Sequence, residues 1–355
     1  MLPPALGRLR SSATALALTV VLGACQGLPG VPSTQSGPAA TIAQPSPAGT
    51  VTIYSGRSKE LVEPLIERFR GASGLQVRTN YASTTDLAAT ILEEGSASPA
   101  DVFLSQDAGA LGALAAEGRL AQLPRSVLDE VDPRFRSPDG VWAGVSGRAR
   151  VAAYDTRVLS EGDLPGSILD FTDPAWKGKL GWAPSNASLQ SFVTALRVLR
   201  GEDGARAWLE GIEANEPMVY EGNSQALEGV ASGEIQVALI NHYYLLEAVA
   251  ERGELPVANY FFPGGDPGSL VNVAGAGILA TAKNTDAAIA FVEFLLSDES
   301  QRYFSEKTYE YPLVDGIGAD ERLRPLAEID APDIDLSDLA DLQGTLDLMQ
   351  EVGVL

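Results

Sequence analysis

The chain has 355 residues but only one cysteine, Cys25, and only one histidine, His242. Zinc centres combine several histidine or cysteine ligands, so these counts exclude a metal site of that type. A lone cysteine also excludes a disulfide within the chain. The chemistry that depends on clustered His or Cys side chains is therefore absent from this protein.

Motifs of nucleotide-binding and hydrolytic enzymes are also missing. No serine lies in a G-x-S-x-G elbow and no P-loop occurs. Gly275-Ala276-Gly277 lacks the third glycine of a dinucleotide-binding motif, and close strand packing explains it better. Carboxylates are plentiful, but no pair stands out by its spacing. We expect a protein that is not an enzyme, with hydrolysis by two carboxylates kept as an alternative.

Basic residues are few. The chain has 25 Lys and Arg against 47 Asp and Glu, which gives a formal net charge of −22. Binding to nucleic acid requires a basic surface, so we exclude nucleic acid as a partner. An acidic surface is compatible with a cationic cargo, although solubility outside the cell explains most of the charge.

The N-terminus has the features of a secretory signal. Arg8 and Arg10 precede an uncharged stretch, residues 11–24, that is too short to span a bilayer. It ends in Leu22-Gly23-Ala24-Cys25, which resembles the lipobox of bacterial lipoproteins. The resemblance implies a signal peptide over residues 1–24 and a lipid on Cys25, which anchors the protein to the cell membrane from the extracytoplasmic side.

Residues 25–49 are expected to be the lipidated cysteine followed by a flexible tether. The stretch is rich in Pro, Ser, Gly, Thr and Ala and contains no charged residue. Such a composition lacks the periodicity that a packed element needs.

From residue 51 onward, short β-rich runs alternate with amphipathic stretches. A first series predicts strands at 51–54, 75–81 and 101–104 and helices at 59–70, 85–94 and 108–117. A second series predicts helices at 189–199, 204–212, 225–231 and 243–251 and strands at 218–220 and 236–240. Strands that alternate with helices favour two α/β lobes, each with a largely parallel sheet covered by helices.

The stretches 141–154 and 256–262 are the expected crossings between the lobes. Two crossings make a hinge, and a hinge between α/β lobes places the ligand in the cleft. The predicted division is residues 50–148 plus 260–306 for lobe 1 and 149–259 plus 307–355 for lobe 2.

The segment with the most chemical information is Val237 to Tyr244. A buried strand ends there in Asn241, and the adjacent residues Tyr243 and Tyr244 open a helix. The ends of strands in open α/β sheets face the ligand crevice. A trivalent cation displaces the phenol proton, and two phenolates suit Fe(III) better than softer metals. The alternative is that both tyrosines only pack a corner between strand and helix.

Three further points have residues typical of helix N-caps: Ser185-Asn186-Ala187-Ser188, Asn223-Ser224 and Asn241. Free N–H groups at helix N-termini bind anions. Plain capping explains each point by itself, so only their convergence on one cleft would make an anion site.

Five segments together resemble the periplasmic ferric-binding proteins of bacterial iron ABC importers. They are Tyr54 to Arg57, Pro99 to Phe103, Ser146 to Arg150, Trp182 to Asn186 and Asn241 to Tyr244. The resemblance implies an α/β two-lobe periplasmic binding protein, the type II Venus flytrap, with a hinge of two crossing strands. It also implies Fe(III) as cargo and an ABC permease with its ATPase as partners of a monomer.

The same resemblance assigns roles to individual residues. Tyr243 and Tyr244 are the expected iron ligands. A synergistic phosphate or carbonate is expected to complete the coordination, held at the positions that match the family's anion site: Ser185, Asn186, Ala187, Asn223, Asn241 and, facing the anion, Arg148.

The sequence departs from the family at three positions. Many members have a histidine where this chain has Ser58, some have a glutamate ligand where it has Gln106, and a third tyrosine is replaced by Leu189. Gln106 is therefore expected to be a weak ligand of the metal, with anion and water filling other positions.

Three other interpretations fit the same sequence. The same receptor fold could bind an organic phosphate, phosphonate or carboxylate through the helix N-termini and Arg148. A secreted hydrolase on the same lobes, and a purely structural lipoprotein, are alternatives of other classes.

Overall fold

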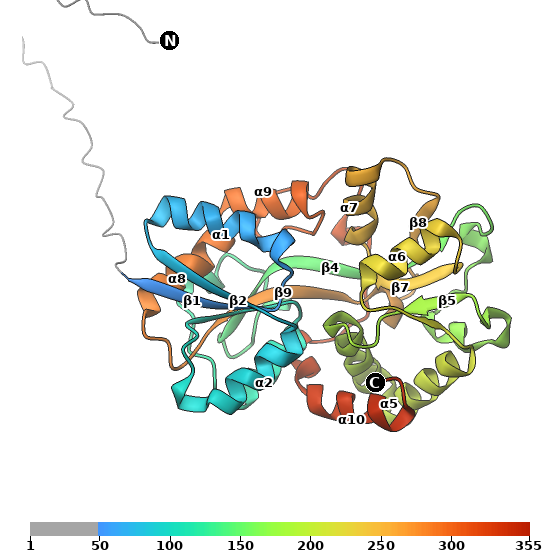
Figure 1. Ribbon diagram of the computed structural model, residues 1–355, viewed down its shortest axis with the longest axis horizontal. Helices are drawn as coiled ribbons and strands as arrows, with labels where there is room; N and C mark the ends of the chain where they lie inside the picture. The colour runs from blue at the N-terminus through green and yellow to red at the C-terminus, as the bar shows by residue number, and fades with distance from the viewer. Residues whose placement is uncertain (1–48) are drawn as a thin grey trace, which may run out of the picture. The chain divides into compact units, whose positions relative to one another are not determined.

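The computed structural model describes residues 49–355 (Figure 1). The predicted signal peptide, the lipid on Cys25 and nearly all of the tether lie outside the described residues. Eight of the nine strands form one hydrogen-bonded path in the order β2-β1-β3-β9-β4-β7-β5-β6, and the ninth, β8, pairs with β4. Among the described residues no helix is long and apolar enough to cross a membrane.

The first half of the path is a sheet built mostly from the N-terminal part of the chain. Its strands are β1 (Thr50–Ser55), β2 (Gln76–Tyr81), β3 (Val102–Ser105), β9 (Val271–Ile278) and the first part of β4 (Trp142–Asp155). β1 runs parallel to β2 and β3, whereas β9 is antiparallel to β3. The accompanying helices are α1 (Lys59–Ser73), α2 (Thr84–Glu94), α3 (Ala108–Ala116), α4 (Arg125–Leu128), α8 (Thr285–Leu295) and α9 (Asp298–Lys307). In Figure 1, α1 and α9 lie on one side of this sheet and α2 on the other.

The second half contains the rest of β4 together with β5 (Leu180–Trp182), β6 (Met218–Val219), β7 (Val237–Asn241) and β8 (Val257–Tyr260). Its helices are α5 (Ala187–Ala214), α6 (Asn223–Ser232), α7 (Tyr243–Arg252) and α10 (Leu342–Val352). The two helices expected at 189–199 and 204–212 are the two parts of α5. They meet at a kink where Gly201 has a φ of 74°, a conformation that glycine adopts without steric cost.

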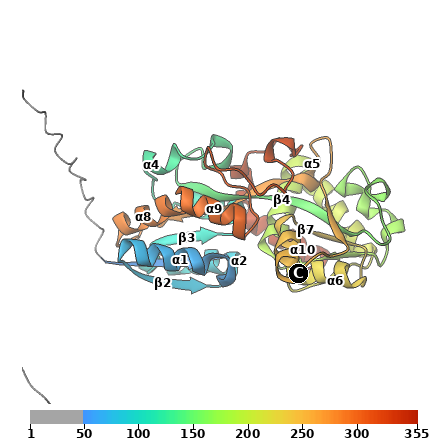
Figure 2. The same ribbon diagram turned by 90° about the horizontal axis from the view of Figure 1, so that it is seen from above.

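Strand β4 connects the two halves. All 14 of its residues are buried. Trp142 to Ala149 pair with β9, and from Arg150 onward the strand pairs with β7. The chain returns to the first sheet between β8 and β9, and β9 begins at Val271 opposite Ala149. Figure 2 shows β4 passing from the group of α8 and α9 to the group of α5 and α6.

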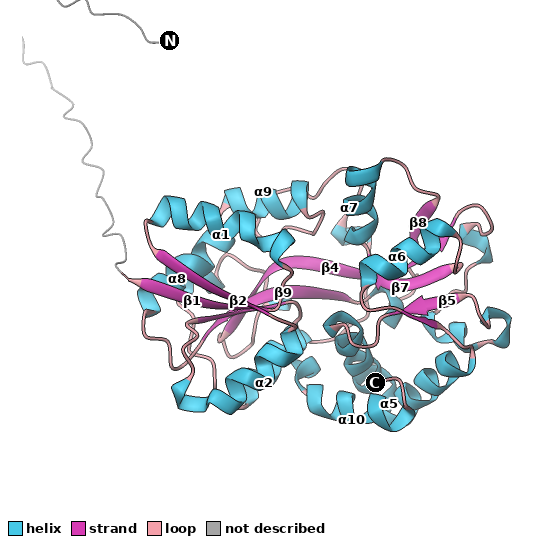
Figure 3. Ribbon diagram, viewed as in Figure 1, coloured by secondary structure: helices cyan, strands magenta, loops and turns pink. Residues whose placement is uncertain are grey.

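Each half has its own apolar core. The larger cluster lies around the first sheet, and two smaller clusters lie around the second. Figure 3 shows helices flanking the strands in both halves. Separate cores joined by buried strands are the architecture that allows two lobes to move about a hinge. The fold class expected from the sequence is confirmed.

Candidate metal centre

The two tyrosines lie where the sequence places them, at the start of α7. β7 is a fully buried apolar strand that ends at Asn241, and α7 begins two residues later at Tyr243. The rings of Tyr243 and Tyr244 are stacked, with centroids 4.2 Å apart and an angle of 28° between their planes. Burial, followed by the proximity of Tyr244, raises the pKa of the Tyr243 phenol well above 10. A phenol in this setting loses its proton only when a strong cation takes its place.

Both tyrosines line a cavity of about 670 Å³ that receives residues from both halves of the fold. The first half contributes polar side chains from the loop after β1, the start of α2 and the end of β3: Arg57, Ser58, Thr84, Thr85 and Gln106. The second half contributes the tyrosines and the turn that opens α5: Ser185, Asn186, Ala187 and Gln190. The predicted metal ligands and the predicted anion-binding turn therefore share one cavity.

Asn186 is the centre of a hydrogen-bond network in this cavity. As the N-cap of α5, its Oδ1 accepts a bond of 3.0 Å from the backbone N–H of Ser188. The same oxygen accepts from the Ser188 hydroxyl at 2.7 Å, from Gln106 Nε2 at 3.4 Å and from Asn223 Nδ2 at 3.5 Å. Gln106, which follows β3, and residues of α5 and α6 thus meet at one amide oxygen. Asn241, the third point expected to converge on the cleft, does not take part in this network.

Gln106 faces the cavity from the end of β3. Its backbone N–H donates to Thr84 Oγ1 at 3.0 Å, and its side-chain Nε2 is committed to Asn186. The side-chain carbonyl oxygen has no hydrogen-bond partner within residues 49–355. A carbonyl oxygen is a neutral ligand that hard cations accept. The geometry is therefore compatible with the weak metal ligand expected at this position.

A second contact joins the two halves across the cavity. The hydroxyl of Thr85, in the first turn of α2, donates to Gln190 Oε1 at 2.9 Å. Gln190 is fixed by a bond of 3.3 Å from its Nε2 to the carbonyl of Pro184. This contact needs no ligand, so the approach of the two halves is partly supported by protein groups alone.

The other predicted anion-binding residues lie at the edge of the cavity or behind its wall. Asn223 opens α6 and lines a neighbouring cavity of about 480 Å³, which Tyr244 also lines. Arg148 and Asn241 are buried and line neither cavity. Within residues 49–355, the three side-chain nitrogens of Arg148 and the Nδ2 of Asn241 have no hydrogen-bond partner.

Two of the positions that depart from the family, Ser58 and Leu189, lie in different surroundings. Ser58 is exposed and lines both cavities. Leu189 is fully buried in an apolar core, so it does not reach the cavity. No group of three or more His, Cys, Asp or Glu side chains that could hold a metal occurs in the part of the chain that the structure describes.

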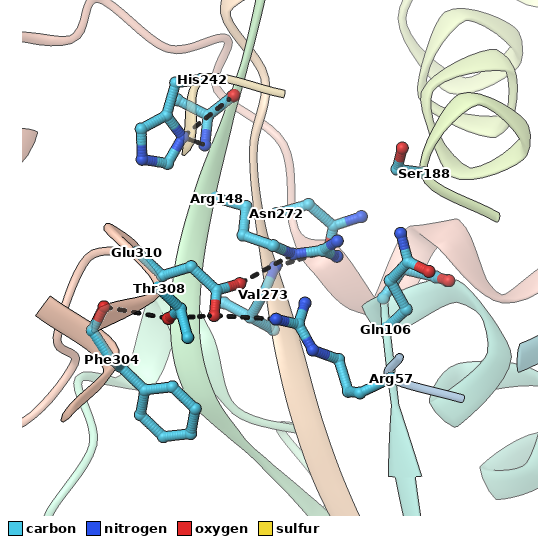
Figure 4. A network of polar contacts seen from close by, with 12 residues as sticks. Arg57, Gln106, Arg148, Ser188, His242, Asn272, Val273, Phe304, Thr308 and Glu310 are labelled. Atoms are coloured by element: carbon cyan, nitrogen blue, oxygen red, sulfur yellow. Dashed lines mark hydrogen bonds and ion pairs between the residues drawn. The ribbon is translucent and has the colours of Figure 1, made fainter. Parts of the chain in front are cut away.

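A charged network next to the tyrosines joins residues that are far apart in the sequence and was not predicted from it. Arg57 donates to Glu310 at 2.8 Å, and Glu310 also accepts from the Thr308 hydroxyl at 3.0 Å. The Arg57 guanidinium lies 6.0 Å from the centroid of the Tyr243 ring, and Arg148 lies 4.0 Å from Glu310. Figure 4 shows both arginines directed toward the Glu310 carboxylate.

Burial and neighbouring charges shift the pKa values of two groups in and beside this network, Arg57 and Glu247. Burial alone would lower the pKa of Arg57, but Glu310 and the neighbouring groups of Tyr243, Tyr244 and Glu247 together outweigh it, and the pKa is raised. Burial, reinforced by Glu310, raises the pKa of Glu247 to about 8, so that this carboxyl is mostly neutral at pH 7. Arg57 was noted in the sequence only as part of a family segment, and Glu310 lies 253 residues away from it.

Comparison with known proteins decides the family. Residues 97–336 match the family described as "Bacterial extracellular solute-binding protein". The chain belongs to this family. Its members are solute-binding transport proteins, so the hydrolase alternative is set aside and an extracytoplasmic location follows.

Several relatives match nearly the whole chain. The major ferric iron-binding protein of Neisseria meningitidis serogroup B is 38% identical over 324 residues, which cover 89% of this chain and 97% of that protein. The Fe(3+)-binding periplasmic protein of Serratia marcescens is 33% identical over 308 residues, with coverage of 86% and 90%.

Solved structures agree with these matches. Iron-bound HitA from Pseudomonas aeruginosa has a TM-score of 0.82 and 36% identity, covering 86% of this chain and 99% of that one. A Trichodesmium protein (IdiA, FutA) in complex with iron and citrate has a TM-score of 0.72 and 31% identity, with coverage of 86% and 99%. The resemblance seen in the sequence is confirmed.

Proposed function

We propose that this protein captures Fe(III) outside the cytoplasm, with the phenolate oxygens of Tyr243 and Tyr244 as its main ligands and Gln106 as a weaker one. The stacked tyrosine pair on the cavity wall carries the proposal, because adjacent phenolates supply the charge and hard oxygen ligands that Fe(III) prefers. The ferric-binding relatives support it.

A synergistic anion, phosphate or carbonate, completes the coordination in this proposal. Ser185, Asn186 and Ala187 form the opening turn of α5 on the cavity wall, where N–H groups of a helix N-terminus attract anions. Asn223, Asn241 and Arg148 complete the proposed anion site. The side-chain nitrogens of Arg148 and Asn241 lie behind the cavity wall without a hydrogen-bond partner in residues 49–355, and in this proposal the Arg148 charge favours the anion electrostatically.

Binding is proposed to close the two lobes, with the boundaries predicted from the sequence, and to present the closed form to an ABC permease and its ATPase. Ligands contributed by both lobes stabilise the closed state more than the open one, which is the condition for ligand-driven closure. The protein acts in this scheme as a monomer held at the membrane by the lipid on Cys25.

Titration of the purified protein with ferric citrate, in the presence of phosphate or carbonate, tests the iron proposal. We expect a visible phenolate-to-iron absorption band that saturates at one iron per protein. The absence of a band, together with thermal stabilisation by an organic phosphate, phosphonate or carboxylate, would instead show a receptor for organic anions.

The anchor is tested separately by Cys25→Ser. The substitution is expected to abolish incorporation of labelled fatty acid into the protein in growing bacterial cells, because the chain has no other thiol to acylate. Ser33→Ala, in the tether, is the matched control and should leave labelling unchanged. Fatty acid on the Cys25→Ser protein would contradict the lipoprotein assignment.

A further inference from the structure

His242 separates the last residue of β7 from the first residue of α7, and its side chain is completely buried. Ala149 N–H donates to its Nδ1 at 3.1 Å. Its Nε2 lies 3.0 Å from the carbonyl oxygen of Tyr309. Nδ1 also lies 3.3 Å from the Ala149 carbonyl oxygen, but it accepts the shorter bond from Ala149 N–H, so we assign the ring proton to Nε2, which donates to the Tyr309 carbonyl. Both nitrogens are thus occupied by protein groups. His242 therefore has no free nitrogen to offer a metal.

The partners of His242 lie where the two halves of the fold meet. Ala149 is the last residue of β4 that pairs with β9, and the next residue already pairs with β7. The backbone repeats the contact, because His242 N–H donates to the Ala149 carbonyl at 2.9 Å. His242 is thus attached to β4 at the residue where this strand changes from one sheet to the other.

A further segment at this junction contains Tyr309 and Tyr311 and forms an isolated β-bridge with β4. Tyr311 pairs with Gly147 of β4, and its ring stacks on the His242 imidazole with centroids 4.6 Å apart. Tyr309 has a φ of 52°, which is costly for a residue with a side chain and persists only where neighbours enforce it. The bond from His242 to the Tyr309 carbonyl is one such constraint.

We propose that His242 is a positioning residue that fixes the tyrosine pair to the junction between the lobes. The inference rests on the proposed role of Tyr243 and Tyr244 as iron ligands. Because Tyr243 follows His242 directly, a rotation at the junction is transmitted through the imidazole to the first turn of α7. The orientation of the phenol oxygens then follows the angle between the lobes, so the ligands align on closure and separate on opening.

The expected consequence is kinetic. When both side-chain bonds are removed, iron keeps the same ligands but the closed arrangement is less well held. We expect His242→Leu to release iron to a competing chelator such as EDTA about 10- to 100-fold faster, as the loss of one to two buried hydrogen bonds predicts. One iron per protein and an unchanged band wavelength are expected, because no ligand is lost.

Two conservative variants separate the two bonds. The amide oxygen of His242→Asn can still accept from Ala149 N–H, and the amide nitrogen of His242→Gln can still donate to the Tyr309 carbonyl. Both should show release rates between those of the wild type and His242→Leu. They also test the proposal if His242→Leu does not fold.

Gln301→Leu is the matched control. Gln301 is fully buried and bonds the carbonyl of Val145 on β4 and the N–H of Leu313, but within residues 49–355 its side chain makes no hydrogen bond to α7. Its loss should lower thermal stability and leave the iron release rate unchanged. A wild-type release rate in His242→Leu, or equal acceleration in Gln301→Leu, would overturn the proposal. A wild-type protein without a visible band would overturn the iron-binding function itself.

Discussion

Replacing Tyr243 and Tyr244 together by phenylalanine is expected to abolish the visible absorption band and nearly all binding of Fe(III). Loss of a group that only supports a metal ligand costs about 10- to 100-fold in affinity. Loss of two phenolate ligands is therefore expected to cost more than about a thousandfold. Phenylalanine keeps the ring, so the stacked pair and the cavity wall are preserved. Spectrophotometric titration with ferric citrate, in competition with a chelator, measures the loss.

Tyr81→Phe provides the matched control for the tyrosine pair. Tyr81 lines the same cavity from the end of β2, but its hydroxyl donates to Glu63. Its substitution removes a phenol from the cavity wall without removing a proposed ligand, so the band and the affinity should be retained. A double Tyr243→Phe/Tyr244→Phe variant that keeps the wild-type band would show that iron is bound elsewhere.

Much of the fold follows from local sequence periodicity. The strand expected at 51–54 is β1, the helix expected at 59–70 is most of α1, and the strand expected at 236–240 is β7. The longer helices that were not predicted, α9 and α10, lie near the C-terminus. α9 is a largely polar helix that buries only one face, including Tyr303 and Phe304, so its apolar signal is short and dispersed.

For the candidate site too, the positions of single residues follow from local sequence, whereas the contacts between distant residues do not. The positions of Tyr243, Asn186 and Asn223 could be anticipated because strand ends and helix starts in α/β lobes face the cleft. Which groups meet across the cleft could not. The bond from Thr85 to Gln190 and the pair of Arg57 with Glu310 join residues 105 and 253 positions apart, and no local pattern encodes such contacts.

The second large effect is expected from Glu310→Gln. This substitution removes the only carboxylate bonded to Arg57 in the part of the chain that the structure describes, and it also removes the anion 4.0 Å from Arg148. Side chains of the Arg57–Glu310 pair are at most 2% exposed. Breaking a buried pair from one side leaves an uncompensated charge, which typically costs about 3–5 kcal/mol. We expect a loss of this size in the free energy of unfolding, measured by urea denaturation.

An exposed ion pair of the same protein provides the control for this loss. Asp298 lies 3.8 Å from Arg302 on the surface of α9, with both side chains more than half exposed. Asp298→Asn should change the free energy of unfolding by less than about 0.5 kcal/mol. Equal small effects of Asp298→Asn and Glu310→Gln would show that the buried network does not contribute to stability.

The two partners of the buried pair are expected to be unequal. In Arg57→Met, Glu310 keeps Arg148 as a nearby cation and the Thr308 hydroxyl as a donor, so the destabilisation should be smaller than in Glu310→Gln. The double variant Arg57→Met/Glu310→Gln leaves only Arg148 without its anion and should be more stable than the sum of the two single losses predicts, because contacting residues are not additive. Additive losses would mean that Arg57 and Glu310 act independently. In that case the ion pair, although only 2.8 Å long, would have no measurable interaction energy, and packing alone would hold the loop after β1 against the junction.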